Sequence, residues 1–215
     1  MTLELGVLVS GSGSNLQALL DASQNGALDA RIRVVISNRP GVYALERAQR
    51  AGVPVVTIDH KAFPSREAFD AELVSQLRAH GVEWVALAGF MRVLTPVFID
   101  AFADRIVNIH PALLPSFPGV DGPGQAFRAG VRVAGCTVHF VELGVDSGPI
   151  LVQRAVAVLP GDDEDALRAR ILEQEHQAFV EALELLSRGT ARLERDEQGR
   201  GRVRFEVPGA RASST

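Results

Sequence analysis

Apolar, β-branched runs recur through the first half of the chain, and helical patterns separate them. The runs cover residues 5–10, 32–37, 53–58 and 84–89. They show no regular polar alternation, which is typical of strands that are buried on both faces. Strands that alternate with helices in this way form right-handed βαβ units. The sequence therefore predicts an α/β fold with a mostly parallel sheet covered by helices.

The spacing of leucine and phenylalanine supports the helical segments. After the first strand, Leu16, Leu19 and Leu20 share one helical face. After the third strand, Phe69, Leu73 and Leu77 do the same. A longer helix is predicted to begin after Asp162 or Asp163, because either carboxylate can accept hydrogen bonds from free N–H groups. It ends near Arg188. Each pattern indicates an amphipathic helix that covers a sheet.

The second half of the chain departs from this alternation. A fifth strand is predicted near residues 105–109, and two long β segments at 132–142 and 150–158 could pair as a hairpin. After the long helix, a polar hairpin turns near residues 198–201. The mostly parallel sheet is therefore expected to end in antiparallel segments.

Composition places the chain among ordinary globular proteins. Of its 215 residues 47% are hydrophobic and 22% are charged, which is enough apolar material for a full core within one domain. We expect that single domain to span residues 1–207 and to end in the C-terminal hairpin. Residues 208–215 are predicted to form a flexible tail.

Charge and cysteine usage exclude several classes of function. The net charge of −4 offers no basic field for nucleic-acid phosphates, and no apolar run approaches about twenty residues. We therefore expect a cytoplasmic monomer or homodimer that binds small molecules, and neither nucleic acid nor a membrane. The single cysteine, Cys136, excludes a disulfide framework and a CxxC metal site and is expected to be a buried hydrophobe.

A glycine-rich turn, SGSGSN, joins the first strand to the first helix at residues 10–15. Glycines let the backbone approach a ligand, and a helix N-terminus presents free N–H groups with partial positive charge, so the turn suits a phosphate. It is not a dinucleotide fingerprint, because Leu16 stands where the third glycine of GxGxxG would be. A tight turn capped by Ser14 or Asn15 is the structural alternative, and the turn alone does not decide between the two.

Polar side chains end the fifth strand in the sequence NIHP. In open α/β sheets ligands bind at the carboxyl ends of the strands, which places this segment, the glycine turn and residues 89–94 on one rim. Asn108 and His110 are two residues apart, so both side chains face the same way on an extended strand. An Asn amide can donate to a developing oxyanion, and a His can donate or exchange a proton near neutral pH. These two residues are therefore a candidate catalytic pair.

Two acidic residues are further candidates, and their spacing leaves their roles open. Asp146 reaches His110 only if the preceding β segment pairs with the fifth strand, and it would then favour the charged imidazole. A turn aspartate that bonds its own backbone is the simpler alternative. Glu175 and His176 fall within the apolar stripe of the last helix. A carboxylate in that position needs either an Arg or polar groups of a ligand.

Taken together, these segments resemble a known family. SGSGSNLQ, SREAFD, LAGFMRVL, NIHPALLPSFPG, VHFV, DSGPIL and EQEH occur in the order and spacing of the folate-dependent phosphoribosylglycinamide formyltransferases, from about residue 4 to residue 190. The resemblance implies the formyltransferase fold, a mostly parallel twisted sheet with a Rossmann-like N-terminal half. It also implies that the formyl group of 10-formyltetrahydrofolate is transferred to the amine of glycinamide ribonucleotide in purine synthesis, with no metal.

The resemblance further implies a role for individual residues. Asn108, His110 and Asp146 match the catalytic trio, in which Asn108 and a protonated His110 stabilise the oxyanion and Asp146 keeps the histidine charged. The ribonucleotide site is matched by Gly13, Ser14, Asn15, Leu172 and Glu175. The folate site is matched by Arg66, Met91, Arg92, Val93, Leu94, Asn108, Glu142, Leu143, Gly144, Val145 and Asp146. The two arginines are suited to the anionic glutamyl tail of the folate.

One loop departs from the family pattern. After PSFPG the family usually continues with a histidine and a short polar run, whereas here Asp121 takes the histidine's place and Gly122, Pro123 and Gly124 follow. We expect the proline-rich loop to be a mobile lid whose contacts and closure differ from those of the family. Thr137 stands where the family commonly has Ser, which keeps the hydroxyl group.

Other activities are possible on the same fold. A formyltetrahydrofolate hydrolase would use the same trio with water as the acceptor, but such enzymes carry an additional N-terminal regulatory domain. Methionyl-tRNA formyltransferase carries a further C-terminal domain, and we expect neither domain here. A non-catalytic sensor of phosphate ligands would not need the complete trio. Formyl transfer to the ribonucleotide is therefore the expected reaction, with hydrolysis as the alternative.

Overall fold

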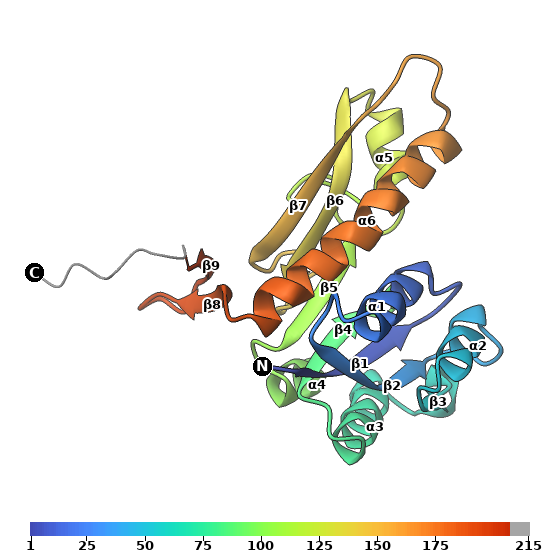
Figure 1. Ribbon diagram of the computed structural model, residues 1–215, viewed down its shortest axis with the longest axis vertical. Coiled ribbons are helices and arrows are strands. Elements are labelled where there is room, and N and C mark those ends of the chain that lie inside the picture. Colours follow the sequence, from blue (N-terminus) through green and yellow to red (C-terminus); the bar gives the residue numbers. More distant parts are fainter. Residues whose placement is uncertain (207–215) are drawn as a thin grey trace, which may run out of the picture.

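Seven strands form one sheet in the computed structural model, which describes residues 1–206 (Figure 1). Their order is β3-β2-β1-β4-β5-β6-β7; the pairs up to β4–β5 are parallel, and β5–β6 and β6–β7 are antiparallel. A separate ribbon pairs β8 with β9. The bounds are β1 Leu3–Val9, β2 Ala30–Ser37, β3 Val55–Thr57, β4 Trp84–Leu87, β5 Ile106–His110, β6 Val133–Phe140, β7 Ile150–Ala157, β8 Ala191–Arg195 and β9 Gly201–Phe205.

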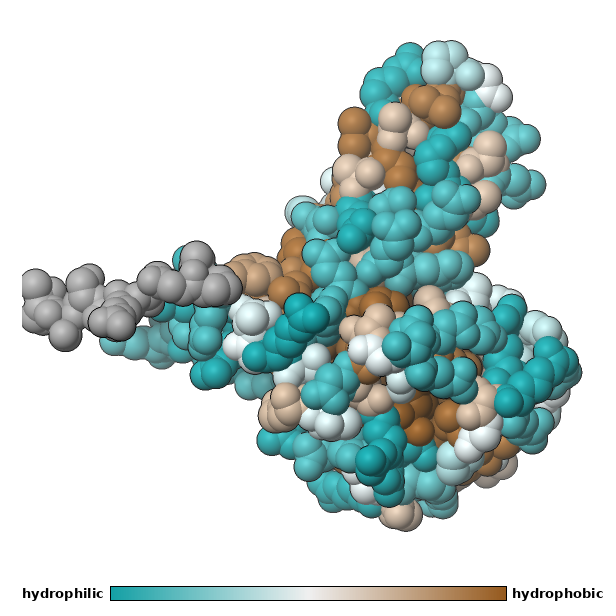
Figure 2. Space-filling view, viewed as in Figure 1, coloured by the Kyte–Doolittle hydropathy of each residue, from teal (hydrophilic) through white to brown (hydrophobic). Residues whose placement is uncertain are grey.

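Helices cover both faces of this sheet. On one face the long helix α6 crosses the sheet beside α1, with α2 and α5 on the same side, and α3 and α4 cover the other face (Figure 1). The outer surfaces of α1 and α6 are mainly hydrophilic (Figure 2), as expected for amphipathic helices. The bounds are α1 Ser14–Gln24, α2 Tyr43–Arg50, α3 Arg66–Ala79, α4 Pro96–Ala101, α5 Gly122–Arg128 and α6 Glu164–Ser187, with a short 3-10 helix at His60–Ala62.

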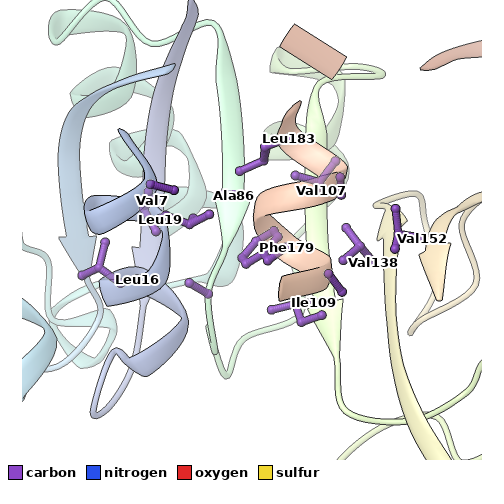
Figure 3. Close-up of a cluster of buried hydrophobic side chains, with 14 of the residues drawn as sticks. Val7, Leu16, Leu19, Ala86, Val107, Ile109, Val138, Val152, Phe179 and Leu183 are labelled. Carbon is purple, nitrogen blue, oxygen red and sulfur yellow. The ribbon is translucent and has the colours of Figure 1, made fainter. Parts of the chain in front are cut away.

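Two hydrophobic clusters, one on each face, hold the helices on the sheet. On the α6 face, Phe179 packs with Val107 and Val138 (Figure 3). On the opposite face, Leu8 packs with Phe69 of α3. Because the central strands send alternate side chains into the two clusters, their sequences are apolar at nearly every position. This packing leaves the carboxyl ends of the parallel strands as the open rim.

The predicted architecture is confirmed, including the mostly parallel sheet, the β6–β7 hairpin, the long helix and the terminal ribbon. Asp163 caps α6 by accepting a hydrogen bond of 2.8 Å from the Ala166 amide. Asp162 instead pairs with Arg170 at 2.7 Å. Cys136 is free and buried, as expected, and burial raises the pKa of its thiol to about 12.

Helix α5 is not predicted by the sequence pattern, because Gly122, Pro123 and Gly124 are typical of a loop. Proline is tolerated in the first turn of a helix, where its missing N–H has no intrahelical partner. The predicted tail at 208–215 lies outside the described residues, and the predicted domain boundary at residue 207 stays a prediction. None of the helices within residues 1–206 combines the length and the apolar character needed to cross a membrane.

Candidate active site

A cavity of about 300 Å³ opens at the carboxyl ends of β4 and β5, a size that suits a small-molecule ligand. Asn108, His110 and Asp146 all line it, so the three residues that the family resemblance groups together share one cavity. The ends of β4 and β6 and two loops supply most of the remaining lining: Gly89, Phe90, Met91, Arg92, Val93, Leu94, Gly119, Val120, Asp121, His139, Val141, Glu142, Gly144, Val145 and Ser147.

His110 is held by oxygen atoms at both of its ring nitrogens. Its Nε2 donates to the carbonyl oxygen of Phe117 at 2.9 Å, and its Nδ1 lies 3.4 Å from Oδ2 of Asp146. Only 4% of His110 is exposed. A carbonyl and a carboxylate can only accept hydrogen bonds. Both ring nitrogens of His110 therefore face acceptor atoms.

Asp146 is fixed from two sides in an unusual backbone conformation. Its φ of 51° lies in the left-handed region, which non-glycine residues seldom adopt. The Gly119 amide donates to Oδ2 at 2.7 Å. Burial opposes the charged carboxylate, but the nearby His139, the Gly119 amide and His110 outweigh it and hold the pKa of Asp146 below its usual range. Asp146 is therefore an anion beside His110, and it is more than a turn residue that bonds its own backbone.

The pairing of β5 with β6 explains how Asp146 reaches His110. Asn108 lies opposite His139 in this antiparallel pair, and the turn of residues 142–149 follows directly after β6. The Phe140 amide donates to the Pro149 carbonyl at 2.9 Å and closes that turn. A Cβ atom at Gly148 would collide with the Phe140 carbonyl, so the turn requires glycine there. The β segment before Asp146 therefore does pair with the fifth strand, as contact between Asp146 and His110 requires.

His139 is a site residue to which sequence reasoning gives no role. Its Nδ1 faces the Phe140 carbonyl at 2.8 Å, and its Nε2 lies 3.7 Å from Oδ1 of Asp146. Nδ2 of Asn108 lies 3.1 Å from the same Nε2. His139 thereby contacts both the Asn108 amide and the Asp146 carboxylate. A histidine within the apolar segment VHFV was the available signal.

The glycine turn has the geometry of an anion site at the start of α1. Gly13 adopts φ 74°, and a Cβ there would lie 2.6 Å from Cβ of Ala44, so glycine is required. No side chain caps α1, which contradicts the alternative of a turn capped by Ser14 or Asn15. The first N–H groups of α1 therefore remain free of side-chain acceptors among the described residues.

Asn15 instead ties this turn to the last helix. Its Nδ2 donates to Oε2 of Glu175 at 2.7 Å, and its Oδ1 is buried with no hydrogen-bond partner in residues 1–206. Glu175 is 8% exposed, and burial raises the pKa of its carboxyl group although the Asn15 amide acts against it. The partner of Glu175 is thus an amide and not the arginine considered from sequence. Gly13, Ser14, Asn15, Leu172 and Glu175 do not line the 300 Å³ cavity.

Residues 91–94 are held against the cavity by neighbouring elements. The Met91 amide donates to Oγ of Ser10 at 2.8 Å, and Arg66 donates to the Val93 carbonyl at 2.8 Å. Asp70, which is buried, accepts from the Thr95 amide at 2.6 Å. Arg66 therefore orients this segment from outside the cavity lining, whereas Arg92 lines the cavity itself. Leu143 likewise lies outside the lining, with 63% of its surface exposed.

Asp121 joins the proline-rich loop to α6 through an ion-pair network. It pairs with Arg168 at 2.8 Å and with Arg128 at 2.9 Å, and both arginines also pair with Glu164. Hydrogen bonds from Arg168 and then Arg128 lower the pKa of Asp121 to about 2. A Cβ at Gly124 would lie 2.7 Å from carboxylate oxygens of both Asp121 and Glu164, so the GPG sequence leaves room for the network. The mobility of this loop stays a prediction.

Comparison with known proteins adds independent information. Residues 4–183 match the family model described as formyl transferase. The phosphoribosylglycinamide formyltransferase of Escherichia coli (strain K12) is 44% identical over 173 residues, which cover 80% of this chain and 82% of that protein. No group of three or more His, Cys, Asp or Glu residues that could hold a metal ion is found among the described residues.

Larger proteins and solved structures also match. The trifunctional purine biosynthetic protein adenosine-3 of Drosophila melanogaster is 54% identical over 187 residues, and the chain spans only 14% of its length. The crystal structure of glycinamide ribonucleotide transformylase 1 from Symbiobacterium toebii matches with a TM-score of 0.91 and 50% identity, over 96% of this chain and 95% of that chain. Fold and sequence therefore agree over nearly the whole described chain.

Proposed function

The chain belongs to the formyl transferase family, and from this we propose that it transfers the formyl group of 10-formyltetrahydrofolate to the amine of glycinamide ribonucleotide in purine biosynthesis. The observation that carries the proposal is the meeting of Asn108, His110 and Asp146 around one cavity, with Asp146 held as an anion 3.4 Å from the histidine. Asn and His side chains are among the donors that stabilise the oxyanion in acyl transfer.

The reaction forms one bond and breaks another. The amine nitrogen attacks the formyl carbon, a C–N bond forms, and the carbonyl electron pair moves onto the oxygen. The bond from this carbon to N10 of the folate then breaks, and N10 takes up a proton equivalent to the one that the amine loses through water. A preorganised donor to the oxyanion typically contributes about 10²–10³ in rate, or about 3–4 kcal/mol.

Asn108 and His110 act on the oxygen in this proposal. An N–H of the Asn108 amide donates to the oxyanion, and the contact with His139 at 3.1 Å holds that amide in place. His110 supplies positive charge, which the Phe117 carbonyl and the Asp146 carboxylate both favour. Because Asp146 remains charged at neutral pH, it keeps the imidazolium in place without taking its proton.

The ribonucleotide is proposed to bind at the junction of the glycine turn and α6. Gly13, Ser14 and Asn15 present the N–H groups of the first turn of α1 to the phosphate. Glu175, tied to Asn15 at 2.7 Å, accepts from ribose hydroxyl groups, and Leu172 lies one turn before it on α6. This places the phosphate on β1 and α1 and the amine toward the rim of β5.

The formyl folate is proposed to occupy the 300 Å³ cavity. Its ring system lies between residues 91–94 on one side and residues 142–146 on the other. Arg92 lines the cavity and suits the glutamyl carboxylates of the folate. Arg66 orients residues 91–94 through its hydrogen bond to the Val93 carbonyl and is a second candidate partner for these carboxylates. Asn108 and Asp146 then meet the formyl end of the folate.

The test uses the purified chain with 10-formyltetrahydrofolate, in the presence and absence of glycinamide ribonucleotide. We expect tetrahydrofolate to form only when the ribonucleotide is present, with an equal amount of formylated ribonucleotide. Tetrahydrofolate that forms equally fast without the amine would instead identify a hydrolase with water as the acceptor. In the same assay His110→Ala is expected to lose turnover while it still binds folate.

The remaining expectations about the molecule stay predictions. We expect the chain to act on small molecules in the cytoplasm, as a monomer or homodimer, with no metal and no nucleic-acid or membrane partner. Sedimentation of the purified protein with and without both substrates distinguishes a monomer from a homodimer.

A further inference from the structure

We propose that Arg195, on the C-terminal ribbon, is a positioning residue for the turn that carries Asp146. This turn, residues 142–149, is called the Asp146 turn below. The proposal rests on the proposed formyl transfer, because that function places the Asp146 turn against the folate. Arg195 itself does not line the cavity, so it acts through the turn and not on a reacting group.

One guanidinium group joins three segments of the chain. Nη2 of Arg195 lies 3.0 Å from Oε1 of Glu142, the first residue of the Asp146 turn. Nε of Arg195 lies 3.2 Å from each carboxylate oxygen of Asp104, and Nη2 pairs with the same carboxylate. Nη1 donates to the Gly199 carbonyl at 2.9 Å, which fixes the guanidinium within its own ribbon. The guanidinium thus contacts two carboxylates at once, through hydrogen bonds to Asp104 and an ion pair with Glu142, whose Oε1 has no hydrogen-bond partner among the described residues.

The two carboxylates belong to the two segments that supply the catalytic trio. Asp104 lies just before β5, the strand that ends with Asn108 and His110. Glu142 begins the turn that carries Asp146. The Arg195 guanidinium therefore connects the start of β5 to the start of the Asp146 turn. His110 lies at the other end of β5.

Apolar packing does little to hold the shape of the Asp146 turn. Leu143 is 63% and Val145 is 52% exposed, so apolar burial contributes little. Asp146 adopts a left-handed φ that only surrounding contacts can maintain. The ribbon packs directly on the turn, since a Cβ at Gly201 would lie 2.6 Å from Cγ of Pro149. The ribbon is therefore a support for this turn.

Loss of Arg195 is expected to loosen the Asp146 turn and to leave the sheet intact. The β5–β6 pairing is made by backbone hydrogen bonds, including that from the Val141 amide to the Ile106 carbonyl at 2.9 Å. Ligands that contact the turn bind less well when it must first be ordered. We therefore expect a weaker affinity for formyl folate and an unchanged affinity for the ribonucleotide, which is proposed to bind at Gly13–Asn15 and Glu175.

The experiment compares Arg195→Gln with the matched control Arg204→Gln in the full chain. Arg204 also lies on the ribbon, and its ion pair with Glu194 at 2.9 Å joins β9 to β8. Hydrogen–deuterium exchange of the ligand-free protein should be about fivefold faster across residues 142–149 in Arg195→Gln and unchanged in Arg204→Gln. Arg195→Lys keeps the positive charge but loses the planar set of guanidinium donors, so its exchange rate across residues 142–149 should lie between those of the two Gln variants.

A kinetic comparison gives the second readout. In Arg195→Gln the KM for formyl folate should rise about three- to tenfold, while the KM for the ribonucleotide stays within about twofold. Equal exchange across residues 142–149 in Arg195→Gln and Arg204→Gln overturns the proposal, as does a KM for both substrates that rises by the same factor. If the wild-type chain transfers no formyl group, the proposed function fails, and the exchange comparison still decides the role of Arg195.

Discussion

The two ends of the candidate site are built in different ways. At the end that holds Asn108, His110 and Asp146, the polar atoms already meet partners from the protein, such as the Phe117 carbonyl and the Gly119 amide. At the glycine turn, α1 begins without a side-chain cap, and Oδ1 of Asn15 is buried with no partner among the described residues. The first end is organised before a ligand arrives, and the second keeps hydrogen-bonding capacity for one.

This difference assigns separate kinetic effects to the two ends. Groups that are fixed in advance around a developing charge act on the transition state and determine kcat. Groups that wait for a ligand act equally on substrate and transition state, so their loss raises KM. Substitutions at each end should therefore separate kcat from KM.

The largest effect is expected for Asp146→Asn. An amide cannot supply the negative charge that favours imidazolium at His110, so kcat should fall by about 10²–10³. The affinity for formyl folate should change by less than about threefold, because the size of the side chain is kept. Steady-state kinetics and a folate binding isotherm measure the two quantities. A wild-type kcat in this variant would remove Asp146 from the mechanism.

Gly13→Ala should have the next largest effect, and it acts on folding. A Cβ at this position would lie 2.6 Å from Cβ and 2.8 Å from Cα of Ala44, in a left-handed conformation with φ 74°. We expect a loss of about 2 kcal/mol in the free energy of unfolding, measured with urea. Gly11→Ala is the control, because a Cβ there meets no atom within 4 Å and the change should be about 0.5 kcal/mol or less. Equal losses would contradict the close approach of α1 and α2.

Glu175→Gln is expected to raise the KM for the ribonucleotide about tenfold, with kcat nearly unchanged. The same variant tests the buried carboxyl. Burial raises the pKa of the Glu175 carboxyl group in the folded state above its unfolded value, so folding loses free energy as pH rises from the usual carboxyl range to that raised pKa. As pH rises from about 4, the wild-type protein should therefore lose stability relative to Glu175→Gln, as measured by thermal unfolding. A larger loss in the variant would contradict this burial.

The smallest effect is expected for Asp121→Asn. The ion pairs of Asp121 lie at the surface and are screened by solvent, so kcat and both KM values should change by less than about threefold. Because its pKa is about 2 in the folded protein, the stabilisation is complete above the usual carboxyl range and is lost as pH falls toward 2. The free energies of unfolding of the wild type and the variant should therefore approach each other as pH falls toward 2. A persistent difference at pH 2 would show that the network is not the cause.

Sequence patterns within a single segment predict the strands and helices whose structure depends mainly on that segment. The apolar runs, the spacing of Leu16 and Leu19, and the cap at Asp163 predict the sheet, α1 and α6. Asn108 and His110 are predicted as a pair because the period of two in a strand places both on one side. The family resemblance then groups them with Asp146, and the cavity contains all three.

Features that depend on register or on distant partners could not be derived in the same way. His139 faces Asn108 only because β6 pairs with β5 in one particular register. Asp121 pairs with Arg168, 47 residues later in the chain, and this network accompanies a helix that GPG alone does not predict. Arg195 meets Asp104 across 91 residues. Each of these contacts is set by tertiary packing that a single sequence does not encode locally.

The most direct test of the account measures a single turnover with both substrates saturating, in wild type, Asp146→Asn and Glu175→Gln. Saturation removes differences in binding and leaves the chemical step. The account predicts that Glu175→Gln transfers the formyl group within about threefold of the wild-type rate, while Asp146→Asn is slower by about 10²-fold or more. If both variants are slowed equally at saturation, the two ends of the site do not divide binding from catalysis, and the account is wrong.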